Sequence, residues 1–156
     1  MKKILLLAAL CCITLLSYAQ QKFLSYEDLA YLETNNLHKI NEFMQQKGYS
    51  SSATKKLGTL KFTLQSNGNS SEVEIRADGR RLYIYIVTDE IQQVNLLNNS
   101  IQPYLLSTEE TSGVTILKVK DLGIIYTTVN DKVPYSPIKR DYDFSIVSEN
   151  NTTAYN

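Results

Sequence analysis

The sequence predicts a small α+β domain, in which two or three short helices pack on one face of an antiparallel sheet of about five to six strands. Three observations support this fold class. Apolar residues recur at helical spacing in segments 25–47 and 89–103. Several other segments alternate apolar and polar residues, which is typical of half-buried strands. Asp78-Gly79 is the strongest turn signal, and it joins two of these strands into a hairpin.

Capping residues place the three helices. Ser25 begins the first helix, because a serine side chain can accept hydrogen bonds from free backbone amides. Asn36 begins the second helix, and Gly48 lies where a helix commonly ends. We expect a third helix to follow a cap at Thr88-Asp89 and to end or bend at Pro103.

Alternation of apolar and polar residues places the strands. Segments 50–54 and 109–113 lack it and are predicted as loops. The predicted strands are 60–65, 72–77, 80–87, 114–120, 124–129 and 142–146.

The order of the elements also fits a duplicated α-β-β-β unit. The helix segment that begins at Ile40 weakly matches the one that begins at Val94. The strand that begins at Leu82 matches the one that begins at Tyr142, but the two strands lie further apart in the chain than the two helix segments do. Because the separation changes and the identity is low, a coincidental likeness remains the alternative.

Residues 1–19 have the three-part pattern of a cleavable export signal. Lys2 and Lys3 precede an uncharged run, and Ala19 ends a motif of the kind that signal peptidase cleaves. The run of 13 residues is shorter than the about 20 that a membrane span needs. We therefore predict cleavage between Ala19 and Gln20, a periplasmic or secreted protein without a transmembrane segment in its mature form, a single domain over residues 20–148 and a flexible tail over residues 149–156.

Cys11 and Cys12 both lie inside this segment, so the mature chain is predicted to contain no cysteine. Leu10 precedes Cys11, whereas a lipoprotein signal needs a small residue there, and this argues against a lipid anchor. The mature chain would hold one histidine, His38, and no cluster of carboxylates beside it, so we expect no metal site and no cofactor. Its basic residues are scattered, and we expect no nucleic-acid partner.

The first 21 residues support a resemblance to a group of proteins. Met1-Lys2-Lys3, the leucine-rich run and Tyr18-Ala19-Gln20-Gln21 resemble the signals of exported proteins from Bacteroidetes-type bacteria. Cleavage in those proteins typically leaves a glutamine at the new N-terminus. The remainder is similar in general character to small uncharacterised exported proteins of that group. The resemblance implies an address outside the cytosol, and it indicates no named functional family.

The Asp78-Gly79 turn predicts which side chains share a face. If these two residues form the loop, Arg76 lies opposite Arg81. Since side chains alternate along a strand, one face of the hairpin is apolar and the other is polar. Tyrosine and arginine are enriched where proteins bind partners, so we interpret the polar face as a candidate binding face. An ordinary solvated face is the alternative. The candidate binding residues are Glu72, Glu74, Arg76, Arg81, Tyr83 and Tyr85.

The sequence contains no recognisable catalytic motif, so we name no catalytic residue. The carboxylate pairs Glu72/Glu74, Glu109/Glu110 and Asp141/Asp143 are each predicted to be solvated. We expect a non-enzymatic binding module whose partner is a protein or a glycan of the cell envelope. The alternatives are an envelope-directed hydrolase that uses paired carboxylates and a small carrier of an apolar ligand.

Overall fold

The structure is a computed structural model of the 156-residue chain, and it describes residues 22–54, 56–79, 81–131 and 140–149. The predicted export signal, residues 1–19, lies outside the described residues. The same holds for residues 150–156 of the predicted tail.

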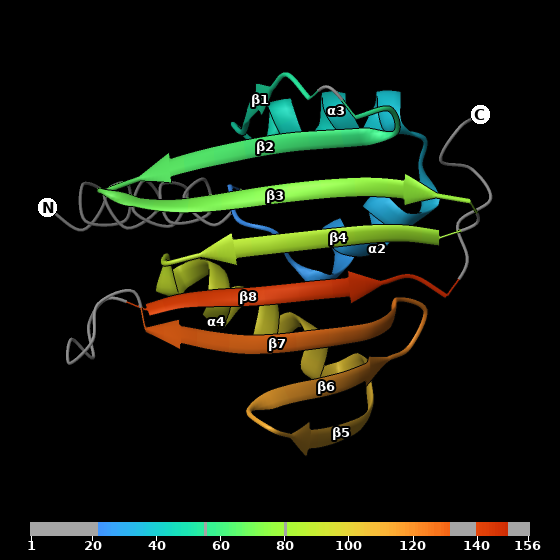
Figure 1. Cartoon of the computed structure of the whole chain (residues 1–156), viewed down its shortest axis with the longest axis vertical. Helices are drawn as coiled ribbons and strands as arrows, with labels where there is room; N and C mark the ends of the chain where they lie inside the picture. Colours follow the sequence, from blue (N-terminus) through green and yellow to red (C-terminus); the bar gives the residue numbers. More distant parts are fainter. Residues whose placement is uncertain (1–21, 55, 80, 132–139, 150–156) are drawn as a thin grey trace, which may run out of the picture.

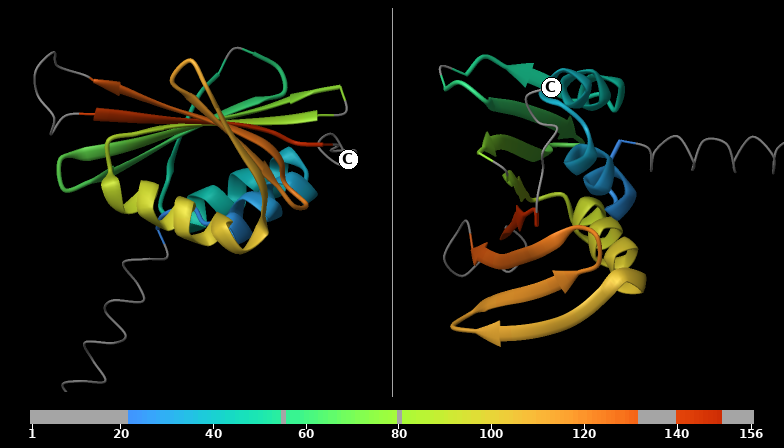
Figure 2. Two further views of the ribbon diagram at one scale, coloured as in Figure 1. Left: turned by 90° about the horizontal axis from the view of Figure 1, so that it is seen from below. Right: turned by 90° about the vertical axis from the view of Figure 1, so that its right-hand side faces the viewer.

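Within the described residues, three α-helices cover one face of an open, twisted antiparallel sheet of eight strands (Figures 1 and 2). This arrangement confirms the α+β class and the antiparallel sheet, whereas the predicted size of five to six strands is wrong. The strand order across the sheet is β1-β2-β3-β4-β8-β7-β6-β5. The elements are α2 (Tyr26–Thr34), α3 (Leu37–Gln46), β1 (Ser50–Ser52), β2 (Thr59–Ser66), β3 (Asn69–Asp78), β4 (Arg81–Thr88), α4 (Ile91–Ile101), a short 3-10 helix η1 (Gln102–Tyr104), β5 (Leu105–Thr111), β6 (Val114–Val119), β7 (Gly123–Asp131) and β8 (Arg140–Val147).

The two edge strands account for the larger sheet. β1 consists of three exposed serines that pair with β2, and β5 is exposed along almost its whole length and polar from Ser107 onwards. Glu109 and Glu110 lie in β5, although the sequence predicts a loop there. An edge strand has solvent on one side and is often protected by charged side chains. It therefore lacks the alternation by which strands are predicted.

Two of the predicted helix caps are confirmed. The Ser25 hydroxyl accepts a hydrogen bond from the backbone amide of Asp28, whose carboxylate accepts one from the Ser25 amide at 2.8 Å. The Asn36 side chain accepts from the amide of Lys39 at 3.0 Å. The third cap is Glu90 rather than Thr88-Asp89, because the Thr88 hydroxyl is bonded to Ser71 and the Asp89 carboxylate accepts from the amide of Ser70.

The hairpin between β3 and β4 has a different register from the predicted one. Asp78 pairs with Arg81, so the turn lies one residue later than predicted and Arg76 lies opposite Tyr83. Gly79 adopts a positive φ of 61°, which glycine tolerates. This register also joins the buried hydroxyls of Ser71 and Thr88 at 2.6 Å, which satisfies both groups away from water. The shift leaves every side chain on the face that was predicted for it.

The sheet consists of two halves with the same order of elements. α3 is followed by the meander β1–β4, and α4 is followed by the meander β5–β8. β4 and β8 meet in the middle (Figure 1). Two residues, 79–80, connect β3 to β4, whereas eight residues, 132–139, connect β7 to β8. The longer second connection explains why the matching strands lie further apart in the chain than the matching helices.

The core lies between the sheet and the three helices. Fully burying a large apolar side chain contributes about 1.5–3 kcal/mol, so this layer supplies most of the driving force for folding. As a result, the helices are held on one face and leave the opposite face of the sheet uncovered (Figure 2). The largest fully buried side chains are Phe62, Leu24, Leu29, Leu32, Ile40, Met44, Ile75, Leu82, Ile84, Ile86, Leu97 and Ile101.

Candidate binding face of the sheet

We use the term open face for the face of the sheet that carries no helix. Alternation along the strands assigns residues to this face, because their neighbours in the chain are buried in the core. All six candidate binding residues lie on the open face, three on β3 and three on β4. Arg81 lies beside the hairpin turn, whereas the other five surround two adjoining depressions.

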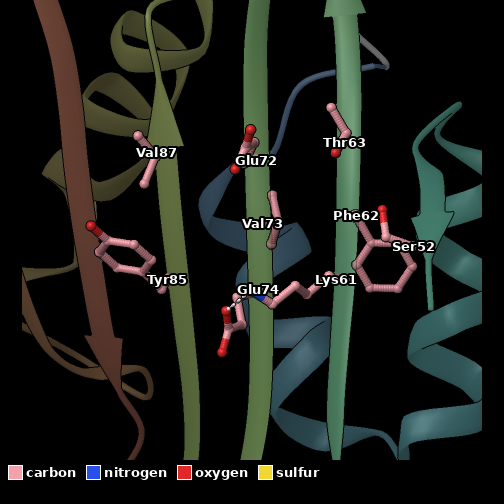
Figure 3. A pocket seen from close by; sticks show the side chains of 9 residues that line it. All are labelled: Ser52, Lys61, Phe62, Thr63, Glu72, Val73, Glu74, Tyr85 and Val87. Atoms are coloured by element: carbon pink, nitrogen blue, oxygen red, sulfur yellow. Dashed lines mark ion pairs between the residues drawn. The ribbon is translucent and has the colours of Figure 1, made fainter. Parts of the chain in front are cut away.

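The first depression lies over β2, β3 and β4 and encloses about 330 Å³ (Figure 3). The side chain of Lys61 reaches from β2 to Glu74, with 2.7 Å between Nζ and Oε2. This hydrogen bond and the negative charge of Glu74 raise the pKa of Lys61. The two groups therefore neutralise each other at the floor of the depression. Glu72, Thr63, Ser52 and Tyr85 also line it.

The second depression lies over β3, β4 and β8 and encloses about 240 Å³. The guanidinium carbon of Arg76 lies 4.9 Å from the centre of the Tyr83 ring, which is the geometry of a cation–π contact. The Nε of Arg76 is buried and has no hydrogen-bond partner among the described residues. Ser145, Val147 and Tyr85 complete the lining.

Tyr85 lies between the two depressions and belongs to both. This residue is 41% exposed. Partial burial and the negative charges of Asp143 and Asp141 raise the pKa of Tyr85. The phenol therefore stays neutral at physiological pH and can offer an apolar surface with a polar tip.

The apolar surface continues across strands that the sequence does not connect to the hairpin. Tyr85 lies opposite Ser145, which lies opposite Tyr126 on β7. Val147 on β8 lies directly opposite Ile124 in the same way. Tyr126 and Ile124 are each 37% exposed. We call Tyr83, Tyr85, Val147, Ile124 and Tyr126 the aromatic patch.

Sequence reasoning missed the β7 and β8 part of this patch. Ile124 and Ile125 are consecutive apolar residues, so alternation alone does not say which of them faces the core. The pairing of β7 with β8 and of β8 with β4 decides the orientation. Ile125 is fully buried, and Ile124 therefore lies on the open face.

The predicted carboxylate pairs do not converge on one site. Val87 on β4 separates Glu72 from Asp143 on β8. Asp143 accepts hydrogen bonds from Asn130 and Thr128, and Glu74 is paired with Lys61. The remaining pair, Glu109/Glu110, lies on the distant edge strand β5.

His38 lies on α3, away from the open face, 3.8 Å from Glu42 and largely exposed. The described residues contain no group of three or more histidine, cysteine or acidic side chains that could hold a metal ion. Among the same residues, no helix combines the length and the apolar character needed to cross a membrane.

Comparison of the chain with protein-family models, with curated proteins and with solved structures gives no match.

Proposed function

We propose that the protein is an exported, non-enzymatic binding module that holds a partner protein against its open face. The observation that carries this proposal is the aromatic patch, a group of half-exposed tyrosine and aliphatic side chains on three adjacent strands. Contiguous apolar patches bordered by polar residues are typical of protein-binding surfaces. Tyrosine and arginine contribute strongly to the affinity at such surfaces.

The export signal over residues 1–19 supports the location of this function. Its form and its resemblance to signals of Bacteroidetes-type bacteria favour the periplasm or the medium as the place where the partner is met. A protein of the cell envelope is then the natural partner. A glycan remains the alternative within this proposal.

The two other candidate functions have less support. A hydrolase with two carboxylates needs one of them protonated near the scissile bond. Instead, Glu74 is paired with Lys61, and Asp143 accepts two hydrogen bonds from neighbouring side chains. A carrier of an apolar ligand needs an internal cavity, whereas the layer between sheet and helices is filled by fully buried side chains.

The repeated order of elements belongs to the same proposal. We propose that both halves derive from one unit of a helix and four strands, one strand more than the predicted α-β-β-β unit. Gly58 and Gly68 have positive φ angles in the turns of the first half, and Gly113 and Gly123 have them in the second. The separation along the chain is the same from Gly58 to Gly113 as from Gly68 to Gly123. The aromatic patch then crosses the junction of the two units.

The double substitution Tyr85→Ala with Tyr126→Ala tests the binding face. We expect it to abolish capture of the partner from the cell envelope fraction, because each substitution removes a large apolar contact at the centre of the patch. The measurement is cross-linked capture followed by mass spectrometry of the cross-linked sites. Tyr31→Ala is the matched control, since Tyr31 is 38% exposed but lies on α2. Capture that survives the double substitution would show that the partner binds elsewhere.

A further inference from the structure

We propose that the second depression is a carboxylate-binding subsite. In it, Arg76 receives the carboxylate of an acidic side chain or of a C-terminus on a peptide segment of the partner. Tyr85 and Val147 contact the apolar residue beside that carboxylate. The inference rests on the proposed protein-binding function and specifies the chemistry that the open face recognises.

The charge of Arg76 is not balanced by an ion pair among the described residues. Glu74 also lines the depression, but its carboxylate is bound by Lys61 at 2.7 Å. The positive charge of Arg76 in the lining of the depression is therefore not neutralised by a carboxylate, and an external anion can bind to it.

The Nε of Arg76 is buried and has no hydrogen-bond partner among the described residues. Buried donors are nearly always satisfied in folded proteins. The Nε–H group and the hydroxyl of Thr59, which lies directly opposite on β2 and also has no partner among the described residues, therefore keep unused hydrogen-bonding capacity on the open face. The planar guanidinium offers Nε–H and a terminal N–H side by side, and this spacing matches the two oxygens of a carboxylate.

The guanidinium of Arg76 is pre-organised by its contact with Tyr83. The Tyr83 ring supports the guanidinium from one side at 4.9 Å, so Arg76 loses little conformational freedom when it binds. The pairing of Arg76 with Tyr83 follows from the observed hairpin register. In the register predicted from the sequence, Arg76 would have faced Arg81 instead.

The size and lining of the depression favour one residue of a peptide over a free small molecule. Its volume of about 240 Å³ is below the roughly 300–1,000 Å³ that sites for small-molecule ligands usually have. The side chains of Tyr85 and Val147 provide apolar contacts. Among the polar groups of the lining, the Glu74 carboxylate is already bound by Lys61, so Arg76 is the charged group that is left for a ligand.

A matched pair of probes tests the subsite on the purified protein. N-acetylphenylalanine carries a carboxylate beside an apolar group, and its primary amide lacks only the charge. We expect the acid to shift the Arg76 Nε–H and Tyr83 ring resonances in NMR titrations and to bind at least about tenfold more tightly than the amide. Equal binding of acid and amide, or no shift at Arg76, would overturn the proposal.

Three substitutions add controls. Arg76→Lys keeps the charge but loses the planar fork, and we expect affinity for the acid to fall about tenfold. Lys61 does not line the second depression, but Lys61→Ala frees the Glu74 carboxylate there. This negative charge should weaken binding of the acid as well. Lys39→Ala, at an exposed position of α3 outside the open face, should change nothing. Unchanged affinity in Arg76→Lys, with a dispersed spectrum that shows a folded protein, would contradict the assignment.

Further outcomes distinguish a peptide carboxylate from a glycan carboxylate, and the carboxylate subsite from the protein-binding face. Galacturonate that binds at Arg76 more tightly than N-acetylphenylalanine would replace the peptide by a glycan and overturn the proposed ligand. Partner capture that is lost in the Tyr85/Tyr126 variant but survives Arg76→Gln would overturn the subsite and keep the binding face. If N-acetylphenylalanine binds at Arg76 but neither the Tyr85/Tyr126 variant nor Arg76→Gln changes partner capture, the carboxylate subsite stands and the protein-binding face is overturned.

Discussion

At the scale of single residues, Glu33 is the least expected side chain of the core layer. It lies on α2 and is 9% exposed. Burial, with a further contribution from the charge of Glu149, raises the pKa of Glu33 to about 8. The folded protein therefore keeps this carboxyl protonated at neutral pH, whereas a glutamate in the unfolded chain ionises near the ordinary value of 4.5.

This difference predicts how stability depends on pH. Between the unfolded and the folded pKa, the folded state binds one proton more than the unfolded state, so the free energy of unfolding falls as pH rises from about 4.5 to about 8. Glu33→Gln removes this titration, and we expect a flatter profile and a higher melting temperature at pH 8. Thermal denaturation followed by circular dichroism at several pH values measures both. Glu109→Gln, on the exposed strand β5, is the control. A profile that is equally steep in Glu33→Gln would show that another group is responsible.

Gln93 is a second buried polar residue with a clear structural role. Its side chain lies on α4, is fully buried, and binds both the amide and the carbonyl of Leu24 at 2.8 Å. These two bonds fasten the segment before α2 to α4. Position 93 therefore requires an amide side chain, which can both donate and accept, rather than an apolar group.

We predict that Gln93→Leu destabilises the protein by about 1–3 kcal/mol, since it leaves the buried backbone groups of Leu24 without partners. Urea denaturation measures the change. Gln92→Leu is the matched control, because the neighbouring Gln92 is exposed. Equal stability of both variants would mean that water satisfies Leu24.

At the scale of elements, the start of β7 depends on a close approach of two backbones. Gly123 has a φ of 95°, and a Cβ atom there would lie 2.4 Å from the carbonyl oxygen of Val147 on β8. β7 and β8 together carry the Ile124, Tyr126 and Val147 part of the aromatic patch. The glycine thus allows the strand pairing on which the patch depends.

We expect Gly123→Ala to destabilise the fold by more than conformational strain alone, which costs about 1 kcal/mol. Gly113→Ala is the matched control, because its φ of 78° is also positive but no atom lies within 4 Å of the added Cβ. Urea denaturation of both variants isolates the clash. Similar losses in the two variants would show that β7 and β8 can move apart without cost.

Prediction of elements succeeded where local chemistry decides the outcome. The caps at Ser25 and Asn36 depend on residues within three positions of each other, and the sequence identifies them correctly. The predicted register of the β3–β4 hairpin was wrong, because the predicted and the observed register both place Gly79 in the loop. The buried pair Ser71–Thr88, 17 residues apart, distinguishes them.

At the scale of the whole molecule, the candidate site is a product of strand pairing over long distances in the sequence. β4 meets β8 in the centre of the sheet, and Tyr85 thereby faces Ser145, which belongs to the last strand of the chain. If the two halves derive from one unit, the aromatic patch is a surface that neither half has alone. A partner that binds there would contact both halves at once.

The sequence by itself determined the fold class, the helix caps at Ser25 and Asn36, the sheet face to which each hairpin residue belongs and the pattern of an export signal, because these follow from periodicity and from neighbouring residues. The tertiary structure alone decided the number of strands, the stacking of Arg76 on Tyr83 and the extension of the aromatic patch to Ile124 and Tyr126. The physical reason is that edge strands carry no alternation, and that register and strand order depend on contacts between residues far apart in the chain.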